Sequence, residues 1–393
     1  LAQTNIAFSN PTIDSIIRDS YNPADYVSSM PITGAANLVQ FLEDNVSEDS
    51  LLAYLTALSN FGNRNTGSDT VSNTFGMGAA RRYGLQKMNE FSAANENRLV
   101  TGYLDFNQPV CGMGFHRNVV DVLPGRNPSG RGFELIEGQK DSRCDGNCDI
   151  NCLAYGADDN GSGTVLVMEL ARVMGQLTFD ETIVFMLTTG EEQGLVGAGA
   201  FANYCNNENI PIPAVYNHDI VGGIYCGNTA SPPGCPGAGD VDSLNVRLYS
   251  FGNYNSQWKQ LARYTKLQYE EMLRPQVAVP MTIQIMTGED RVGRGGDHIP
   301  FRQRNYVSLR MTSANEHGNG APNANYSDRQ HTSGDSLGSD LNGDGSIDSF
   351  YVDFNYLARN TRISGTAVAM TAISPPPITA FTGVAVPGGL AVS

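Results

Sequence analysis

The stretch Thr182–Leu195, TIVFMLTTGEEQGL, contains the features on which both the fold and the candidate site depend. Its apolar first half predicts a buried strand, which ends where Gly190 begins a polar segment. Glu191 and Glu192 follow directly, at the carboxyl end of that strand. Two adjacent carboxylates are costly to keep charged there unless a cation or a proton compensates them. The plainer alternative is the acidic first turn of a helix.

Short apolar runs alternate with helical patterns on either side of this stretch. Strands are predicted at VVDVL (119–123) and FELI (133–136), and a helix is predicted at TVLVMELARVM (164–174). This alternation favours an α/β fold with a mostly parallel central sheet and helices on both faces. In such sheets, ligands bind beyond the carboxyl ends of the strands, so polar residues directly after a strand are the candidates for a site.

The chain is interpreted as one main domain with decorated ends. Residues 1–97 are expected to form an N-terminal extension and a mainly helical flank, because leucines recur at helical spacing within 51–58. The α/β domain is placed at 98–373, and its last helix is expected at about Asp353–Ala372. Residues 374–393 form a Pro-rich tail, for which we expect an extended segment and one added strand, or an arm for self-assembly.

Composition and charge exclude two classes of protein. The chain has 393 residues, of which 40% are hydrophobic and 17% charged, as in globular proteins. No apolar run approaches the roughly 20 residues that a membrane span needs. The net charge of -15 would repel nucleic acid over most of the surface. We therefore expect a peptide substrate or a protein partner, with no membrane span and no nucleic acid.

Seven cysteines favour disulfides and an extracellular location. Three lie in the loop DSRCDGNCDINC (141–152), and two bracket the Pro/Gly-rich loop 226–235. A zinc knot is the alternative for the first loop, but no fourth ligand lies at knuckle spacing. Cys111 and Cys205 either pair with each other or leave a free thiol, so the connectivity stays open. The start at Leu1, without methionine or signal sequence, is also expected of a processed secretory protein.

Three further segments place acidic or imidazole groups where a strand ends or a loop begins. GADDNGSG (156–163) precedes a helix, AVYNHDIVGG (214–223) follows an apolar run, and DRQHTSGDS (328–336) is a polar loop. Taken singly, each has an ordinary interpretation as a capped turn or a hydrogen-bonded histidine. Taken together, carboxylates and one imidazole form a site suited to zinc, where a neighbouring carboxylate can act as general base toward a water.

These segments resemble a known family. GADDNGSG, TTGEEQGL, NHDIVG, GRGGDHIPF and RQHTSGD occur in the order and approximate spacing of the secreted two-zinc aminopeptidases. The wider family includes glutamate carboxypeptidase, glutaminyl cyclase and the catalytically inactive transferrin receptor. The resemblance covers roughly Leu51 to Ile373 and implies the three-layer sandwich of the zinc aminopeptidases.

The resemblance also implies roles for single residues. Asp159 would bridge two metals, Glu192 and His331 would hold one of them, and Asp219 would hold the other. Glu191 would be the general base that takes a proton from the attacking water and passes it to the leaving amine. Two further residues, Asp297 and His298, would lie at the rim of the substrate pocket.

One ligand of the family is replaced. Where the family has a His-Tyr-Asp-Ser motif, this chain has Gln139, Lys140, Asp141 and Ser142, so a glutamine stands in place of the ligand histidine. A glutamine carbonyl is a poor zinc ligand, and Lys140 would add a positive charge near the cation. His218, beside Asp219, could compensate only if adjacent strand residues faced the same way, which alternation opposes.

The sequence therefore predicts a secreted zinc exopeptidase of the aminopeptidase type, with one zinc expected and two still open. The alternative is a catalytically impaired or inactive protein on the same fold, with a structural, assembly or binding role. A single-zinc glutaminyl cyclase is the third hypothesis, because that enzyme also resembles this chain in its DHIPF segment.

A structural calcium ion is predicted independently of the family. In DLNGDGSID (340–348), the oxygen ligands Asp340, Asn342, Asp344 and Asp348 occupy positions one, three, five and nine of a calcium loop. The bidentate glutamate at position twelve is missing, and Asp353 lies close enough in sequence to replace it. A plain polar turn is the alternative.

Overall fold

A computed structural model describes residues 3–128, 130–227, 234–235, 237, 239–291, 294–314 and 329–373, and the backbone of 383–386 and 389–392. The predicted self-assembly arm and the Pro-rich run of the tail fall mostly outside these residues. Within the tail, β12 (Gly383–Val386) pairs with β13 (Gly389–Val392) as a two-stranded antiparallel sheet. The expected single strand is thus a pair.

A nine-stranded sheet forms the centre of the molecule. In spatial order its strands are β1 (Thr4–Phe8), β2 (Val100–Val110), β3 (Met113–Leu123), β5 (Thr182–Thr188), β4 (Phe133–Gln139), β6 (Val215–His218), β9 (Ser308–Ser313), β7 (Asn245–Ser250) and β8 (Thr282–Ile285). The centre, β5-β4-β6-β9, is parallel, whereas β1, β2 and β3 pair antiparallel at one side and β7 runs antiparallel to β9. Outside this sheet, β10 (Gly338–Ser339) pairs with β11 (Ser349–Phe350).

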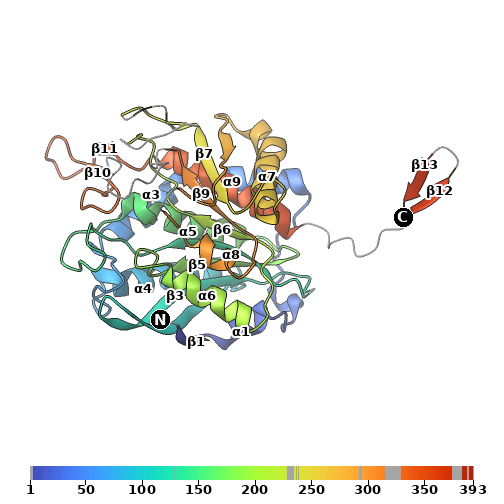
Figure 1. The fold of residues 1–393 in the computed structure, drawn as a ribbon, viewed down its shortest axis with the longest axis horizontal. Helices are drawn as coiled ribbons and strands as arrows, with labels where there is room; N and C mark the ends of the chain where they lie inside the picture. Colours follow the sequence, from blue (N-terminus) through green and yellow to red (C-terminus); the bar gives the residue numbers. More distant parts are fainter. Residues whose placement is uncertain are drawn as a thin grey trace.

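Helices cover both faces of the sheet (Figure 1). One face packs against α2 (Ala35–Asn45), α3 (Glu48–Ser59), α4 (Gly76–Ala94), α5 (Gly163–Met174), α7 (Gln257–Gln268) and α9 (Phe354–Ala372). The other packs against α1 (Pro11–Ile17), α6 (Val196–Asn207) and α8 (His298–Arg302). The α/β fold with a parallel centre and two helical layers is therefore confirmed.

Residue alternation along β5 shows how one apolar run supplies both cores. Ile183, Phe185 and Leu187 pack into the larger core, with α5 and α9. Val184 and Met186 pack into the smaller core, with α6. Because both faces of the strand are buried, the run is hydrophobic throughout instead of alternating with polar residues.

The N-terminal part differs from the expected, mainly helical flank at one point. α3 lies where the leucine spacing predicts a helix, α2 precedes it, and the buried residues of both helices share the core of the main domain. β1, however, extends the sheet at its edge next to β2, as Figure 1 shows. Its residues are exposed or half-buried, and its apolar run of three residues, Ile6 to Phe8, is too short to indicate a strand.

Candidate metal centre

The candidate residues meet at the carboxyl ends of the parallel strands. Glu191 and Glu192 follow β5, Asp219 follows β6, and Asp159 lies in the turn before α5. Together with His331, from the loop that precedes β10, they line a cavity of about 280 Å³. The sheet thus brings together residues that the sequence separates by more than one hundred positions, as expected for an open α/β sheet.

Asp159, Glu192 and His331 have the mutual spacing of metal ligands. His331 Nε2 lies 3.0 Å from Asp159 Oδ2 and 3.3 Å from Glu192 Oε2. Tetrahedral zinc, with ligands at about 2.0–2.2 Å, separates them by roughly 3.3–3.5 Å. The other oxygen of Glu192, Oε1, is buried without a hydrogen-bond partner. This donor set therefore fits one zinc ion.

Two buried carboxylates hold the ligand loops in place. Asp335 accepts hydrogen bonds from the backbone N–H groups of Asp158 (2.9 Å) and Asp159 (3.0 Å). Asp141 accepts from those of Glu191 (3.4 Å) and Glu192 (3.2 Å). Because each carboxylate fixes the backbone of a candidate ligand, both act as positioning residues for the centre.

Burial shifts the protonation of the acidic groups around the cavity. It raises the pKa of Glu191 well above its ordinary value, and the charge of Glu192 adds to the effect. Burial likewise raises the pKa of Asp219 to about 6, although Arg310 opposes it. Asp159 differs: burial would raise its pKa, but the hydrogen bond to His331 and the charges of His331, Arg143 and Arg310 together lower the pKa of the carboxyl. Without a metal, the centre therefore holds protons as well as charges.

A guanidinium group lies among the ligands. Arg143 Nε donates to Glu192 Oε2 at 2.7 Å, and Arg143 Nη2 lies 2.8 Å from His331 Nδ1. Guanidinium has only donors, so the contact requires Nδ1 to be an acceptor. We therefore assign the imidazole proton to Nε2 in this arrangement, facing the two carboxylates.

The second metal position of the resemblance does not fit a metal here. Gln139 Oε1 accepts a hydrogen bond from Asn160 Nδ2 at 2.5 Å. Arg310 Nη2 forms an ion pair with Asp219 Oδ2 at 3.1 Å, and Arg310 Nη1 donates to Asp290 at 2.8 Å. A fully buried arginine thus neutralises the carboxylate that would hold the second ion. Among the residues that the structure describes, Asp159, Glu192 and His331 are the one group with metal-ligand spacing.

Lys140 and His218 point away from the cavity. Lys140 Nζ donates to the carbonyls of Arg117, Leu187 and Thr188, at 2.9, 3.3 and 3.0 Å. The extra positive charge expected from Lys140 comes from Arg143 instead. His218 contacts the carbonyl of Glu137 at 3.1 Å and Ser364 Oγ at 2.7 Å, on the α9 side of the sheet. Strand alternation thus turns it away from Asp219, as predicted.

Asp297 and His298 are fully buried and are not among the residues that line the cavity. Asp297 Oδ2 accepts from Thr188 Oγ1 at 2.5 Å, and burial raises the pKa of Asp297 to about 8. His298 Nε2 lies 3.1 Å from the carbonyl of Glu289. The residues of this region that line the cavity are Arg291, Arg294 and Gly295, from the loop before α8.

The calcium-loop residues form an exposed turn that is held by its own carboxylates. Asp340 accepts from the N–H groups of Gly343 (2.6 Å) and Gly345 (2.8 Å), and Asp348 accepts from Leu341 (2.7 Å) and Asn342 (3.1 Å). Asp353 caps α9 by accepting from the N–H of Tyr356 at 2.8 Å. The same oxygens that would bind calcium also shape the turn.

Comparison with known proteins places the chain in a family. The family model "Peptidase family M28" matches residues 118–347. A probable zinc metalloprotease of Leptosphaeria maculans is 31% identical over 338 residues, which cover 83% of this chain and 74% of the relative. The chain belongs to peptidase family M28. The predicted family is thus confirmed, and the name of the Leptosphaeria maculans relative includes zinc as its metal.

Solved structures share the fold of this M28 chain. The LapA aminopeptidase of Legionella pneumophila has a TM-score of 0.60 at 17% identity, over 89% of this chain and 76% of LapA. Glutaminyl cyclase of Porphyromonas gingivalis has a TM-score of 0.56 at 16% identity, over 83% of this chain and 98% of the cyclase. At these identities the likeness concerns the fold alone.

Sequence reasoning missed three residues of the M28 centre. Asp335 lies within the quoted DRQHTSGDS segment, four positions after His331. The sequence thus indicated that it lies near the site, but not that it holds the backbone of Asp158 and Asp159. Arg143 directly follows the segment in which Gln139 replaces histidine, but nothing in its spacing indicates that it turns inward. Arg310 lies within a strand, where a sequence does not show which carboxylate it will meet.

No helix in the described part of the chain is both long enough and apolar enough to cross a membrane.

Proposed function

We propose that this M28 protein is a secreted zinc-dependent exopeptidase of the aminopeptidase type, with a reduced centre that holds one zinc ion. The observation that supports the proposal is the donor set of Asp159, Glu192 and His331, which lines one cavity with Glu191. Bound there, zinc would polarise the scissile carbonyl and lower the pKa of a water.

The chain's own residues supply proton transfer and positioning. Glu191 lines the same cavity and is free of any role as a ligand of the donor set, so its carboxylate can accept the proton of the attacking water. It then returns that proton to the leaving amine. Asp141 accepts a hydrogen bond from the backbone N–H of Glu191, which helps to fix the position of the base at the cavity.

Secretion is supported by three disulfides: Cys111–Cys148, Cys144–Cys152 and Cys226–Cys235. Disulfides form and persist in oxidising compartments. Cys205 is buried as a free thiol, so the alternative pairing of Cys111 with Cys205 is wrong.

The experiment is hydrolysis of a panel of aminoacyl substrates by zinc-supplemented protein, with Glu191→Gln as the matched variant. We expect cleavage by the wild type and a rate lower by about 10²–10⁴ in the variant, because only the base is lost. Zinc content should be equal in the two proteins. A panel left uncut by zinc-loaded wild type, or a variant as active as wild type, would refute the proposal.

A non-catalytic role is the second candidate, and the two arginines favour it. Arg143 and Arg310 neutralise Glu192 and Asp219, which would otherwise need a metal. In a protein that keeps its fold without zinc, such ion pairs would supply the positive charge that buried carboxylates need. Its signature would be full folding in chelator, no hydrolysis after zinc is supplied, and assembly in native-mass measurements.

The glutaminyl cyclase alternative is supported by the single metal position and the cyclase-like fold. Peptides with an N-terminal glutamine separate it from hydrolysis, because cyclisation releases ammonia and leaves the peptide length unchanged. Unchanged glutamine peptides would end this alternative.

We also propose a structural calcium ion at Asp340, Asn342, Asp344 and Asp348. These four side chains lie in one exposed turn that two glycines with positive φ, Gly343 and Gly345, allow to close. Calcium should raise the melting temperature of the wild type, whereas an Asp344→Asn variant should respond less. An equal response in both would place the calcium elsewhere.

A further inference from the structure

Arg143 is tied to the ligands and to its own loop at the same time. Its Nε and Nη2 atoms contact Glu192 and His331, while Nη1 donates to the carbonyls of Cys144 and Asp145, both at 3.1 Å. The side chain is only 15% exposed. All three guanidinium nitrogens are therefore engaged, which fixes the plane of the group against the ligand pair.

The contact with His331 is incompatible with zinc on that residue. His331 Nε2 is the atom that faces Asp159 and Glu192, so zinc at this position would bind Nε2. Zinc on Nε2 leaves the imidazole proton on Nδ1, which must then donate to an acceptor. Arg143 Nη2, 2.8 Å away, has only donors to offer. Arg143 must leave Nδ1 before His331 can bind a metal.

The contact with Glu192 has the same effect. Arg143 Nε donates to Oε2, the same oxygen that approaches His331 Nε2. A charged donor there competes with a metal for the lone pairs of that oxygen. Its positive charge also repels a second cation across a few ångströms of buried space.

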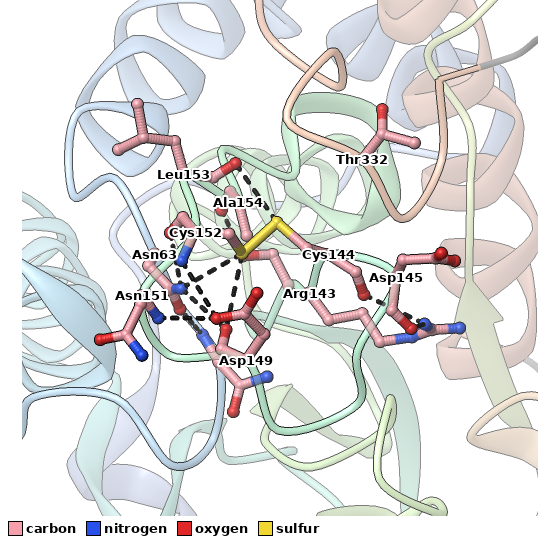
Figure 2. Close-up of a disulfide and its surroundings, with 12 residues drawn as sticks. Asn63, Arg143, Cys144, Asp145, Asp149, Asn151, Cys152, Leu153, Ala154 and Thr332 are labelled. Atoms are coloured by element: carbon pink, nitrogen blue, oxygen red, sulfur yellow. Dashed lines mark hydrogen bonds between the residues drawn. A yellow bond between two sulfur atoms is a disulfide. The ribbon is translucent and has the colours of Figure 1, made fainter.

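Two disulfides restrain the loop that carries Arg143, so its guanidinium stays within reach of Glu192 and His331. The Cys144–Cys152 disulfide closes the loop immediately after Arg143, and Cys111–Cys148 ties the same loop to the turn after β2. Figure 2 shows the Arg143 side chain running from Cys144 alongside Asp145, with hydrogen bonds to the loop carbonyls. Withdrawal therefore requires rotation of the side chain, while the backbone can stay where it is.

We propose that Arg143 is an internal competitor of zinc: its guanidinium occupies the centre beside Glu192 and His331 in the metal-free protein and must withdraw for zinc to bind. Arg143 thus sets the zinc affinity of this chain. The inference rests on the proposed function only for the identity of the metal.

The test is a zinc titration in competition with a chelating indicator, on wild type and an Arg143→Met variant. Methionine keeps the length of the side chain and removes its charge and donors. We expect zinc to bind the variant about tenfold more tightly, since partners of ligand side chains change metal affinity by about 10–100-fold. Arg126→Met is the matched control, because it removes the same charge from an exposed ion pair with Asp180. It should bind zinc as wild type does.

A second readout separates competition from a merely structural role. Without zinc, Arg143→Met should melt below wild type, because the ligand carboxylates lose their counter-charge. With saturating zinc, the difference should disappear. A structural role alone would lower both melting temperatures equally, and that result, like zinc affinity no higher than that of wild type, would overturn the proposal.

An observation on the wild type covers the case in which the variant does not fold. Nitrogen NMR of His331, assigned with a His331→Gln variant, reports which ring nitrogen carries the proton. We expect the proton on Nε2 without zinc and on Nδ1 with zinc. A proton on Nδ1 in the metal-free protein would overturn the proposal. None of these measurements uses peptide hydrolysis. If zinc-loaded protein cleaved no aminoacyl substrate, the proposed function would be refuted, but the role of Arg143 in zinc binding would still be tested.

Discussion

Gln139 is the residue at which this chain departs from its family, yet the structure indicates that restoring histidine there is not sufficient for a second zinc. The carboxylate of Asp219 is paired with Arg310, which is buried and also paired with Asp290. We therefore expect a Gln139→His variant to hold one zinc per chain by elemental analysis, as wild type should. Two zinc ions per chain would show that the incoming metal displaces Arg310.

The buried carboxyl of Glu134, which is remote from the metal centre, should make the free energy of unfolding depend on pH. It is buried on β4 next to Thr371, and burial raises its pKa from 4.5 to about 8. Between these two pH values the folded state keeps a proton that the unfolded state has released. The stability from Glu134 is therefore complete below about pH 4.5 and falls by about 1.4 kcal/mol per pH unit as the pH rises to about 8.

The measurement is denaturant unfolding between pH 5 and 9 for wild type and Glu134→Gln. We expect the difference in free energy of unfolding to shift steadily in favour of the variant as the pH rises, by about 3–5 kcal/mol over the full range. A difference that stays constant with pH would mean that Glu134 is ionised in the folded state.

At the scale of single residues, the sequence indicated the residues that meet in the cavity better than it indicated their neighbours. Asp159, Glu192 and His331 could be expected at one site because each lies in a strand-end or loop motif that the family resemblance contains; their roles as ligands remain a proposal. Arg143 could not, because its importance depends on which way one long side chain turns. Lys140 illustrates the same limit: its charge was expected near the cation, but its amine meets backbone carbonyls of β3 and β5.

Among the structural elements, the loop between β4 and α5 is the one on which the centre most depends. The Cys144–Cys152 disulfide spans eight residues and should contribute about 2–3 kcal/mol by restricting the unfolded chain. A Cys144→Ser/Cys152→Ser variant should lose that much in denaturant unfolding. Because the loop also presents Arg143, the same variant should bind zinc more tightly than wild type.

The Cys226–Cys235 pair is the control for this prediction, because it spans nine residues and is remote in sequence from Arg143. Its double serine variant should lose a similar free energy of unfolding with zinc affinity unchanged. Equal zinc affinity in both variants would mean that the disulfide does not position Arg143.

The elements themselves differ in how far a sequence can indicate them. β5 and α5 were predicted with their bounds nearly correct, because both faces of β5 are apolar and α5 is buried along its length. β1 was missed because this edge strand buries little and its apolar run is only three residues long. The antiparallel edges of the sheet follow from chain connections that no single segment reveals.

At the scale of the whole molecule, zinc binding should appear as a gain in thermal stability. A ligand that binds only the folded state stabilises it by about 2.7 kcal/mol at one hundred times its Kd. For 393 residues, with an unfolding entropy of about 2.1 cal/mol/K per residue, this corresponds to a rise of about 3 °C in Tm. Chelator should reverse the rise.

A His331→Gln variant should show little of this rise in Tm, because one of three ligands is lost. Magnesium, which prefers oxygen ligands, should not reproduce the rise at a site with an imidazole. If His331→Gln gained as much as wild type, zinc would be stabilising the fold from some other position, and the centre described here would hold its arginines in place of a metal.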